Sequence, residues 1–343
     1  MKKILNYVII ACLLGTMHAH AQNFVSNVSK RGTSAATFLS ISQGARATAM
    51  GSAFVAIADD QSALYWNPAG LANLEGTGLL FDHAKWVAGI QYNFLAASYS
   101  LGDAGTLGLS VTTSSSGDMR VTTIDEPQGT GEIFGANDAA VSLAYALRLT
   151  NDFAIGFNPK FIHQSIWKMS ASAFALDLGV RYQTPFKGIV LGMSISNFGS
   201  KLKLSGNNTL VLYDLDPGSG GNNERTPANL STEAWALPLN FRVGIAYHPE
   251  LSASHKLVLA VDAAHPSDNY ESVNLGGEYT FQNFFAVRGG YKALFLSEAE
   301  ESFTLGAGFK QNLLGNVTIT LDYAYSDFGR LKEMQKFSFS ISF

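Results

Sequence analysis

Apolar and polar side chains alternate along much of the chain, and the alternation is clearest from about residue 139 onward. Three phenylalanines and an isoleucine occupy every second position from residue 337 to Phe343, with serine between them. Such period-two patterns predict β-strands that have one apolar and one polar face. A bare aromatic strand at the end of a soluble protein would invite aggregation, whereas a closed barrel pairs its edges and places the aromatic face in lipid.

The same pattern, with the turns that interrupt it, predicts an all-β fold, a transmembrane antiparallel β-barrel of about fourteen strands. The expected strands cover residues 77–87, 90–101, 105–113, 138–149, 153–165, 170–183, 188–198, 235–248, 256–265, 270–281, 284–295, 301–311, 315–326 and 334–343. An even number is typical of single-chain outer-membrane barrels. The long turn from His248 to His255 makes the register weakest there, so a barrel of about twelve strands remains the alternative.

Short turns alternate with longer loops, which include residues 114–138, 199–234 and 326–334. Outer-membrane barrels have short periplasmic turns and long extracellular loops, so both termini are expected in the periplasm. A soluble β-sandwich is the competing interpretation, but it would need polar outward faces. Aromatic residues near strand ends fit membrane-interface girdles instead; they are Trp86, Trp167, Tyr182, Tyr247, Tyr291, Tyr323 and Tyr325.

The N-terminus has the pattern of a secretory signal peptide over residues 1–21. Two lysines precede an apolar stretch at residues 8–14, and Ala19-His20-Ala21 is a small-x-small cleavage site. The alternative is a lipoprotein cleavage box at Cys12. Removal of the signal leaves 21 basic and 27 acidic residues, a formal charge of −6, and takes away the only cysteine. Disulfides are therefore excluded, and no later apolar run is long enough for a membrane-spanning helix.

Residues 22–75 differ from the strands that follow, because they lack sustained alternation and are rich in small residues. They are expected to form short helices and turns that pack closely against a wall. A lumen bounded by fourteen strands is too wide for its own side chains to fill. The sequence therefore predicts two parts in the mature chain, a partly helical N-terminal plug at 22–75 and a barrel at 76–343.

Three motifs in this segment resemble a known family: Gly44-Ala-Arg-Ala47, Met50-Gly-Ser-Ala-Phe-Val-Ala-Ile-Ala-Asp-Asp60 and Ser62-Ala-Leu-Tyr-Trp-Asn-Pro-Ala-Gly70. They are similar to the N-terminal hatch of the PorV/PorQ family, which belongs with the wider FadL-like outer-membrane proteins. In the barrel, the resemblance is confined to strand number and loop plan. It implies a plugged barrel in the outer membrane of a Gram-negative, Bacteroidetes-type bacterium. The implied function is a component of the type IX secretion system or, as the alternative, a channel for long-chain fatty acids or other hydrophobic small molecules.

Seven residues of these motifs are candidate functional positions: Arg46, Gly51, Asp59, Asp60, Asn67, Pro68 and Ala69. Asn67-Pro68 is expected to form a turn, because proline biases the preceding residue away from helix and asparagine bonds its own backbone. The two aspartates are expected to end the preceding helix or to pair with a lumenal arginine. Together these residues either fasten the plug to the barrel or line a gated passage.

Charged residues also occur on the strand faces expected to point into the lumen. Charge there usually forms a paired network that holds plug and strands together. In the alternative, a basic side chain such as Arg242 or Arg288 holds a carboxylate ligand. The lumenal candidates for that role are Arg148, Arg242, Arg288 and Lys292.

Other chemistries find little support. The histidines form no recognisable constellation with serine or aspartate, and no zinc, thiol or phosphate-binding motif appears, so no enzyme activity, metal or cofactor is expected. The loop from Asp214 to Glu224 is too irregular for a calcium site. No basic stripe points to nucleic acid.

The expected partners are outer-membrane lipid, the barrel assembly machinery, and either secretion components and cargo proteins or a hydrophobic small molecule. Phe343 is expected to act as the C-terminal assembly signal. Apolar residues of the two longest loops are expected to make the first contact with a solute or partner; they are Met119, Ile124, Ile133, Phe134, Leu210, Val211, Leu212 and Tyr213.

Overall fold

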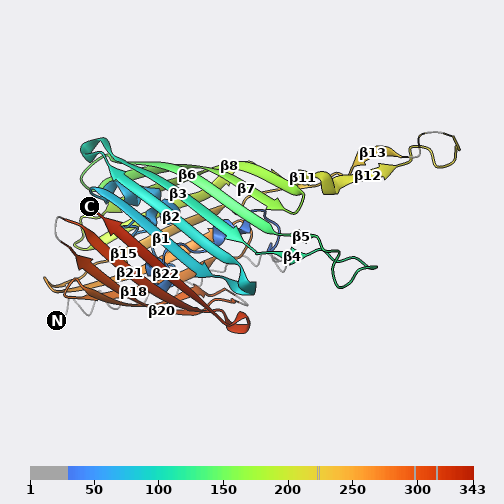
Figure 1. Ribbon diagram of the computed structural model, residues 1–343. Helices are drawn as coiled ribbons and strands as arrows, with labels where there is room; N and C mark the ends of the chain where they lie inside the picture. Colours follow the sequence, from blue (N-terminus) through green and yellow to red (C-terminus); the bar gives the residue numbers. More distant parts are fainter. Residues whose placement is uncertain (1–29, 222, 224, 297–298, 314–315) are drawn as a thin grey trace, which may run out of the picture.

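A computed structural model describes residues 30–343 except 222, 224, 297–298 and 314–315. The predicted signal peptide with Cys12, and the first eight residues of the predicted plug, lie outside the described residues. The main sheet closes on itself as an antiparallel barrel of 14 strands (Figure 1). The closing pair is β1 with β22, because β22 also pairs with β21. The count of fourteen is thus confirmed over the alternative of twelve.

Successive barrel strands are neighbours in the wall. They are β1 (Thr77–Lys85), β2 (Gln91–Ser100), β3 (Thr106–Ser115), β6 (Ala136–Arg148), β7 (Phe153–Ile166), β8 (Met169–Gln183), β9 (Ile189–Gly199), β15 (Asn240–Tyr247), β17 (His255–Pro266), β18 (Ser272–Phe281), β19 (Phe285–Leu294), β20 (Phe303–Asn312), β21 (Thr318–Asp327) and β22 (Glu333–Ser342). Their bounds follow the predicted strands closely. The largest difference is the expected strand at 235–248, which begins only at Asn240.

Short elements fill the connections and the N-terminal part. The additional strands are β4 (Met119–Arg120), β5 (Ile133–Phe134), β10 (Leu202–Lys203), β11 (Ser205–Gly206), β12 (Leu210–Tyr213), β13 (Thr226–Asn229), β14 (Ala234–Trp235) and β16 (Glu250–Ser252). The helical segments are η1 (Thr37–Ser40), α2 (Ala45–Ala49), α3 (Ala63–Trp66), η2 (Pro68–Asn73), η3 (Val87–Gly89), η4 (Gly102–Ala104), η5 (Asn207–Thr209) and η6 (Gly329–Leu331). Within the described ranges, no helix is long and apolar enough to cross a membrane.

Side chains of the wall alternate between the outer surface and the lumen, as the period-two pattern requires. On β1, Phe81 is 46% exposed while the adjacent Asp82 is 1% exposed. Across the closing seam, Phe339 lies opposite Phe81 and Ser338 lies opposite Asp82. The outward face is apolar enough for lipid, and the polar side chains face inward.

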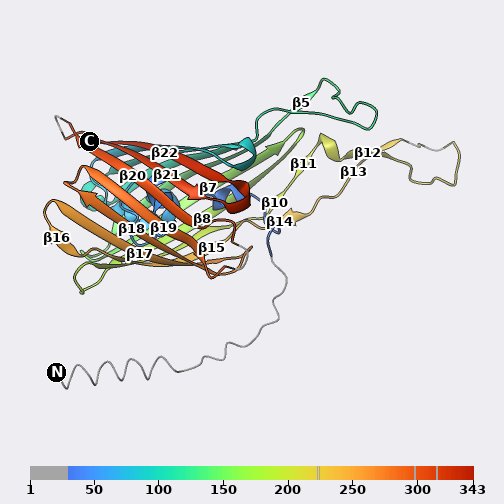
Figure 2. The same ribbon diagram turned by 90° about the horizontal axis from the view of Figure 1, so that it is seen from below.

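The two ends of the barrel differ (Figures 1 and 2). The turns after β2, β6, β8, β18 and β20 lie at one end, together with the C-terminal Phe343. From the other end extend the β4–β5 hairpin (residues 119–134) and the β12–β13 hairpin (residues 210–229). The described chain begins at this second end, where the Ser34 hydroxyl donates to Asp268 in the turn between β17 and β18, at 2.5 Å.

Buried apolar residues form two large clusters inside the barrel. One combines Phe54, Leu64 and Trp66 with residues of the wall, and the other includes Phe38 and Phe328. Trp86, assigned above to a membrane interface, packs on the second cluster, and its ring meets that of Phe328 edge-on with 4.9 Å between centroids. The interface prediction for Trp86 is therefore wrong, because Trp86 follows Asp82 and Ala84 in the series of alternate positions that face inward.

Candidate functional site

The chain between Ala36 and Glu75, called the inner segment below, packs against the lumenal face of the wall. Its helices contact strands all round the barrel, from β3, β6, β7 and β8 on one side to β19, β20, β21 and β22 on the other. Most residues from Phe38 to Leu71 are buried. Small residues permit this approach, because alanine and glycine bring the backbone of the segment close to the backbone of the strands.

Glycines of the wall make room for the inner segment. A Cβ atom at any of five inward-facing glycines would collide with the segment: Gly156 with Pro68, Gly179 with Asn67, Gly192 with Val55, Gly276 with Met50 and Gly290 with Gly51. Gly276 and Gly290 are paired in register on β18 and β19. Gly51 therefore packs against wall backbone that carries no side chain, which accounts for the small residues in its motif.

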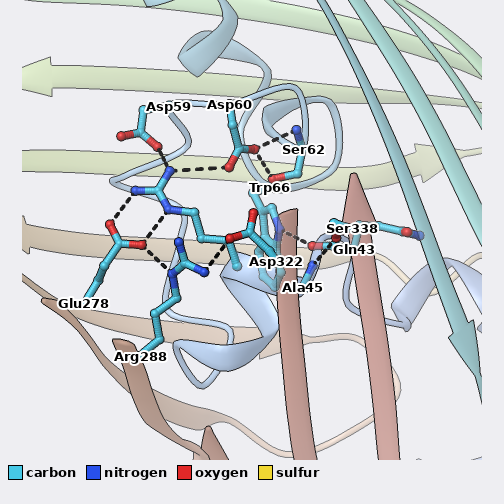
Figure 3. A network of polar contacts seen from close by, with 11 residues as sticks. Gln43, Ala45, Asp59, Asp60, Ser62, Trp66, Glu278, Arg288, Asp322 and Ser338 are labelled. Carbon is cyan, nitrogen blue, oxygen red and sulfur yellow. Dashed lines mark hydrogen bonds and ion pairs between the residues drawn. The ribbon is translucent and has the colours of Figure 1, made fainter. Parts of the chain in front are cut away.

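Arg46 is the centre of an ionic cluster that joins the inner segment to the wall (Figure 3). Its Nε and Nη2 donate to the two carboxylate oxygens of Glu278 at 2.8 Å each, which is bidentate geometry. Its Nη1 donates to Asp59 at 2.5 Å and reaches Asp60 at 3.4 Å. Arg288 completes the cluster by donating to Glu278 at 2.5 Å.

The wall side of this cluster continues from Glu278 through Arg288 to Asp322, whose carboxylate accepts from Arg288 at 2.6 Å. The side chains of Glu278, Arg288 and Asp322 are 4–8% exposed. Buried charges of this kind are stable only when each has a partner. Asp59 and Asp60 thus pair with an arginine of their own segment, and Asp60 also accepts from the Ser62 backbone N–H at 2.8 Å.

A second set of contacts uses carboxylates and hydroxyls of the wall to bond the segment's backbone. Asp262 accepts from the N–H groups of Phe54 and Val55, at 2.7 and 2.9 Å. Thr304 accepts from Gly51 N–H and donates to the Ala49 carbonyl, both at 2.9 Å. A short segment without long helices leaves many backbone groups unpaired, and the wall satisfies them.

Asn67 holds the turn of the third motif. Its backbone is extended, and its side-chain oxygen accepts from Ala69 N–H at 3.1 Å, which begins η2 with Pro68 in the first position. Its side-chain nitrogen donates to the carbonyls of Val55 and Val180, at 2.9 Å each. Asn67 is fully buried, so this one side chain joins two turns of the segment to β8.

The four lumenal candidates for a carboxylate ligand do not converge on one point. Arg288 belongs to the ionic cluster. Arg148 donates to the Ala72 carbonyl at 3.2 Å, and Lys292 pairs with Glu301 at 2.6 Å. The guanidinium of Arg242 lies over the rings of Tyr65 and Trp66, 5.2 and 5.1 Å from their centroids. Each therefore contacts protein groups, which matches the paired-network interpretation rather than a shared ligand site.

Sequence reasoning missed several residues that carry these contacts. Asp82 accepts from Gly44 N–H at 3.0 Å and pairs with the fully buried Lys336. Thr304 and Asn158 bond the segment's backbone. Their signal was an inward position in the alternating pattern, which identifies the face but not the partner. Phe343 closes the barrel by exchanging backbone bonds with Thr77 at 2.8 and 2.9 Å.

The lumen contains a large cavity at the end of the barrel where Phe343 lies, and it is nearly filled beside the inner segment. A cavity of about 610 Å³ lies between the ionic cluster and that end, with Arg46, Asp322 and Ser342 in its lining. Between the segment and strands β3, β6 and β7 there is a cavity of about 20 Å³. In the part of the chain that the structure describes, no group of three or more His, Cys, Asp or Glu side chains is placed to hold a metal ion.

The two hairpins are built differently from the interior. Each is a two-stranded sheet separate from the barrel sheet, and both extend well beyond the barrel (Figure 2). Ile124 is 99% exposed and Leu215 is 74% exposed. At its base, the β4–β5 hairpin is held by Glu132, which accepts from Trp167 at 3.0 Å and pairs with Lys168 at 3.1 Å.

Solved structures show the same fold. The monoaromatic hydrocarbon channel CymD matches with a TM-score of 0.57 at 14% identity, over 88% of this chain and 97% of that one. The toluene transporter TodX of Pseudomonas putida gives 0.56 at 14% identity over the same shares. A FadL homologue of Pseudomonas aeruginosa gives 0.52 at 13% identity, over 87% and 96%. A comparison with curated protein sequences found no match.

The sequence model of one family, described as "Type IX secretion system protein PorV", matches residues 25–212, which is more than half of the 343 residues. The match includes all three motifs of the inner segment, so the predicted resemblance is confirmed. Neither this family nor the structurally similar transporters are described as enzymes. The chain belongs to the PorV family and is an outer-membrane β-barrel of the type IX secretion system.

Proposed function

We propose that this barrel is a closed membrane anchor whose two hairpins bind a secreted or partner protein at the cell surface. In this proposal the end that carries the C-terminus faces the periplasm and the hairpins face outward, as is usual for outer-membrane barrels. Residues 22–75 act as the plug of a barrel that begins at residue 76. The predicted periplasmic position of the mature N-terminus falls on residues before Lys30, outside the described residues.

The observation that carries the proposal is the contrast between the interior and the hairpins. Polar and charged groups of the inner segment bond to the wall at Glu278, Asp262, Thr304 and Asp82. Apolar side chains of the hairpins are instead left in water, with Ile124 as the extreme case. Exposed apolar patches on proteins mark sites of interaction, and here they occur at the end opposite the C-terminus.

A pull-down from the native outer membrane in mild detergent, followed by mass spectrometry, tests this function. The tagged full chain is compared with a variant in which residues 119–134 and 210–229 are replaced by short Gly-Ser linkers. We expect secretion-system subunits or secreted cargo to co-purify with the full chain and to be lost with the hairpins. Equal recovery from both proteins would contradict the role of the hairpins.

Uptake of a hydrophobic solute is the second candidate function, and the shared fold with the hydrocarbon channels favours it. The 610 Å³ cavity would then be the exit chamber below the inner segment. The protein purified in the pull-down distinguishes partner binding from solute uptake. A barrel that carries a stoichiometric hydrophobic molecule and no protein partner would support transport. Candidate gating residues would be Arg46, Asp59 and Asp60, which lie between that cavity and the hairpin end.

A further inference from the structure

The β12–β13 hairpin is an isolated two-stranded sheet, and its two outer edges are not equivalent. Leu210 to Tyr213 pair with Asn229 to Thr226. Sheets of two strands are marginally stable alone in water, and an open edge is a template for a further strand. The character of each edge follows from which backbone groups point outward.

The hydrogen-bond ladder fixes that direction. Leu230 N–H donates to the Thr209 carbonyl at 2.8 Å. Thr209 and Leu230 are therefore a hydrogen-bonded pair, next to the pair Leu210–Asn229. Bonded and non-bonded pairs alternate in antiparallel sheets. The backbone groups of Leu212 and of its partner Pro227 therefore point away from the hairpin, on opposite edges.

Pro227 blocks the edge of β13, because proline has no N–H to offer an added strand. The β12 edge has no such block. Leu212 presents both N–H and C=O there, whereas the N–H of Leu210 is already bonded to Asn207 at the end of η5. The β13 edge is thus interrupted at Pro227, whereas the β12 edge is open at Leu212.

The side chains beside the open edge are apolar and exposed. Leu210 and Leu212 share one face of β12 and are 54% and 56% exposed, while Tyr213 on the other face is 55% exposed. A strand added at this edge would place its alternate side chains beside these groups on both faces. Backbone bonds would give affinity and the side-chain contacts would give selectivity.

The charge of the surroundings indicates the chemistry of the added strand. Residues 207–231, which include the β12–β13 hairpin, contain three acidic residues and one basic residue. Two copies of this chain that paired through β12 would bring like charges together, which opposes self-association. In an extended segment that alternates basic and apolar residues, the basic side chains would complement the acidic residues of the hairpin. The apolar side chains would pack beside Leu210 and Leu212.

We infer that the outer edge of β12, centred on Leu212, accepts an extended, basic and alternately apolar segment of a partner protein as a third strand. This inference rests on the proposed function, because it names the part of the hairpins that binds and the form of the bound segment. The partner is selected by its extended backbone and its alternating side chains, and no preformed pocket is required.

The first test uses a fluorescent peptide of alternating valine and lysine, added to the purified full chain in detergent and followed by anisotropy. Its control is the same peptide N-methylated at alternate residues, which keeps every side chain and removes the donors of one edge. We expect the methylated peptide to bind about tenfold more weakly or worse, since backbone bonds carry the affinity. Equal binding of the two peptides, or no binding of either, would overturn the inference.

The second test changes the chain. Leu212→Pro removes the outward N–H, and Asn229→Pro makes the same change on the blocked edge, at a position whose backbone also points outward. We expect loss of peptide binding for Leu212→Pro, wild-type binding for Asn229→Pro and an intermediate result for Leu212→Ala, which keeps the N–H. Wild-type binding by Leu212→Pro contradicts the inference, as does a concentration-dependent dimer that Leu212→Pro abolishes.

The native pull-down separates this inference from the proposed function. If Leu212→Pro still captures the secretion partners while replacement of residues 210–229 does not, the hairpin binds by another route and only the β12 inference fails. If the partners are captured without either hairpin, the proposed function fails with it.

Discussion

The inner segment and the β12–β13 hairpin both lie outside the barrel sheet, yet their surroundings are opposite. The inner segment is surrounded by wall, and its backbone groups bond to Asp262, Thr304 and Asp82. The hairpin has only its own two strands, and its leucines are exposed. A segment with little stability of its own is fixed where the surrounding wall bonds its polar groups. It remains available to a partner where no such contacts are made.

The largest expected effect is at Glu278, where one carboxylate holds two arginines. Glu278→Gln removes the charge but keeps the shape, and it leaves Arg46 and Arg288 close together with less compensation. We expect a loss of about 3 kcal/mol in the free energy of unfolding, as for other broken buried ion pairs. Urea unfolding followed by the heat-modifiable shift on gels measures it.

The matched control is Glu132→Gln on the β4–β5 hairpin, which also removes a carboxylate that contacts a cation. We expect no measurable change in unfolding there, because exposed pairs contribute little. Similar losses at Glu278 and Glu132 would contradict the distinction between a fixed interior and a free hairpin.

The next effect is steric and tests the contact between wall and segment. A Cβ at Gly290 would collide with Gly51, whereas at the adjacent Gly289, on the outer face, the nearest atom would lie 3.7 Å away. We expect Gly290→Ala to cost about 1–3 kcal/mol in stability, as overpacking does. Gly289→Ala should be neutral in the same urea titration, and equal behaviour of the two variants would show that the segment is not packed on β19.

Replacement of residues 210–229 by a Gly-Ser linker should leave the barrel intact. The hairpin strands pair only with each other, so we expect the unfolding free energy to change by less than about 0.5 kcal/mol, as for surface changes remote from a core. The gel shift that detects Glu278→Gln also measures this variant. A large destabilisation would mean that the hairpin belongs to the folded core.

The smallest effect concerns the base of the β4–β5 hairpin and depends on pH. The Trp167 N–H and the Lys168 ammonium hold the pKa of Glu132 below its usual value. A carboxylate with a lowered pKa stabilises its contact above the ordinary pKa, and this is lost as the pH falls through the lowered one. We expect a nitroxide at Ile124→Cys to become more mobile in acid, by electron paramagnetic resonance. The signal should be insensitive to pH in Glu132→Gln, and a pH-independent signal in both proteins would contradict the role of Glu132.

The sequence predicts the wall well because alternation is a local signal. Phe337 to Phe343 and their counterparts on other strands report which face meets lipid, and turn residues report where strands end. The fourteen strands follow from these two signals. The strand at 235–248 is the exception, because Ala234 and Trp235 pair with β10 instead of continuing β15, a choice that depends on a distant segment.

The interior is only partly predictable, because contacts between the segment and the wall join residues that are far apart in the chain, by as many as 255 positions for Thr304 and Ala49. Arg46 is identifiable from its motif, and Glu278 and Arg288 from their inward positions, but nothing local shows that the three meet. Arg242 illustrates the limit, since its aromatic partners Tyr65 and Trp66 lie in another part of the chain. The face of a residue is encoded locally, whereas its partner is not.

Hydrogen–deuterium exchange of the intact protein in detergent micelles tests the central claim most directly, because one experiment reports both regions. We predict slow exchange for the amides of Phe54 and Val55, which are bonded to buried Asp262, and fast exchange for the amide of Leu212 on the open edge of β12. Equally fast exchange in the two regions would contradict an inner segment that is fixed in the barrel.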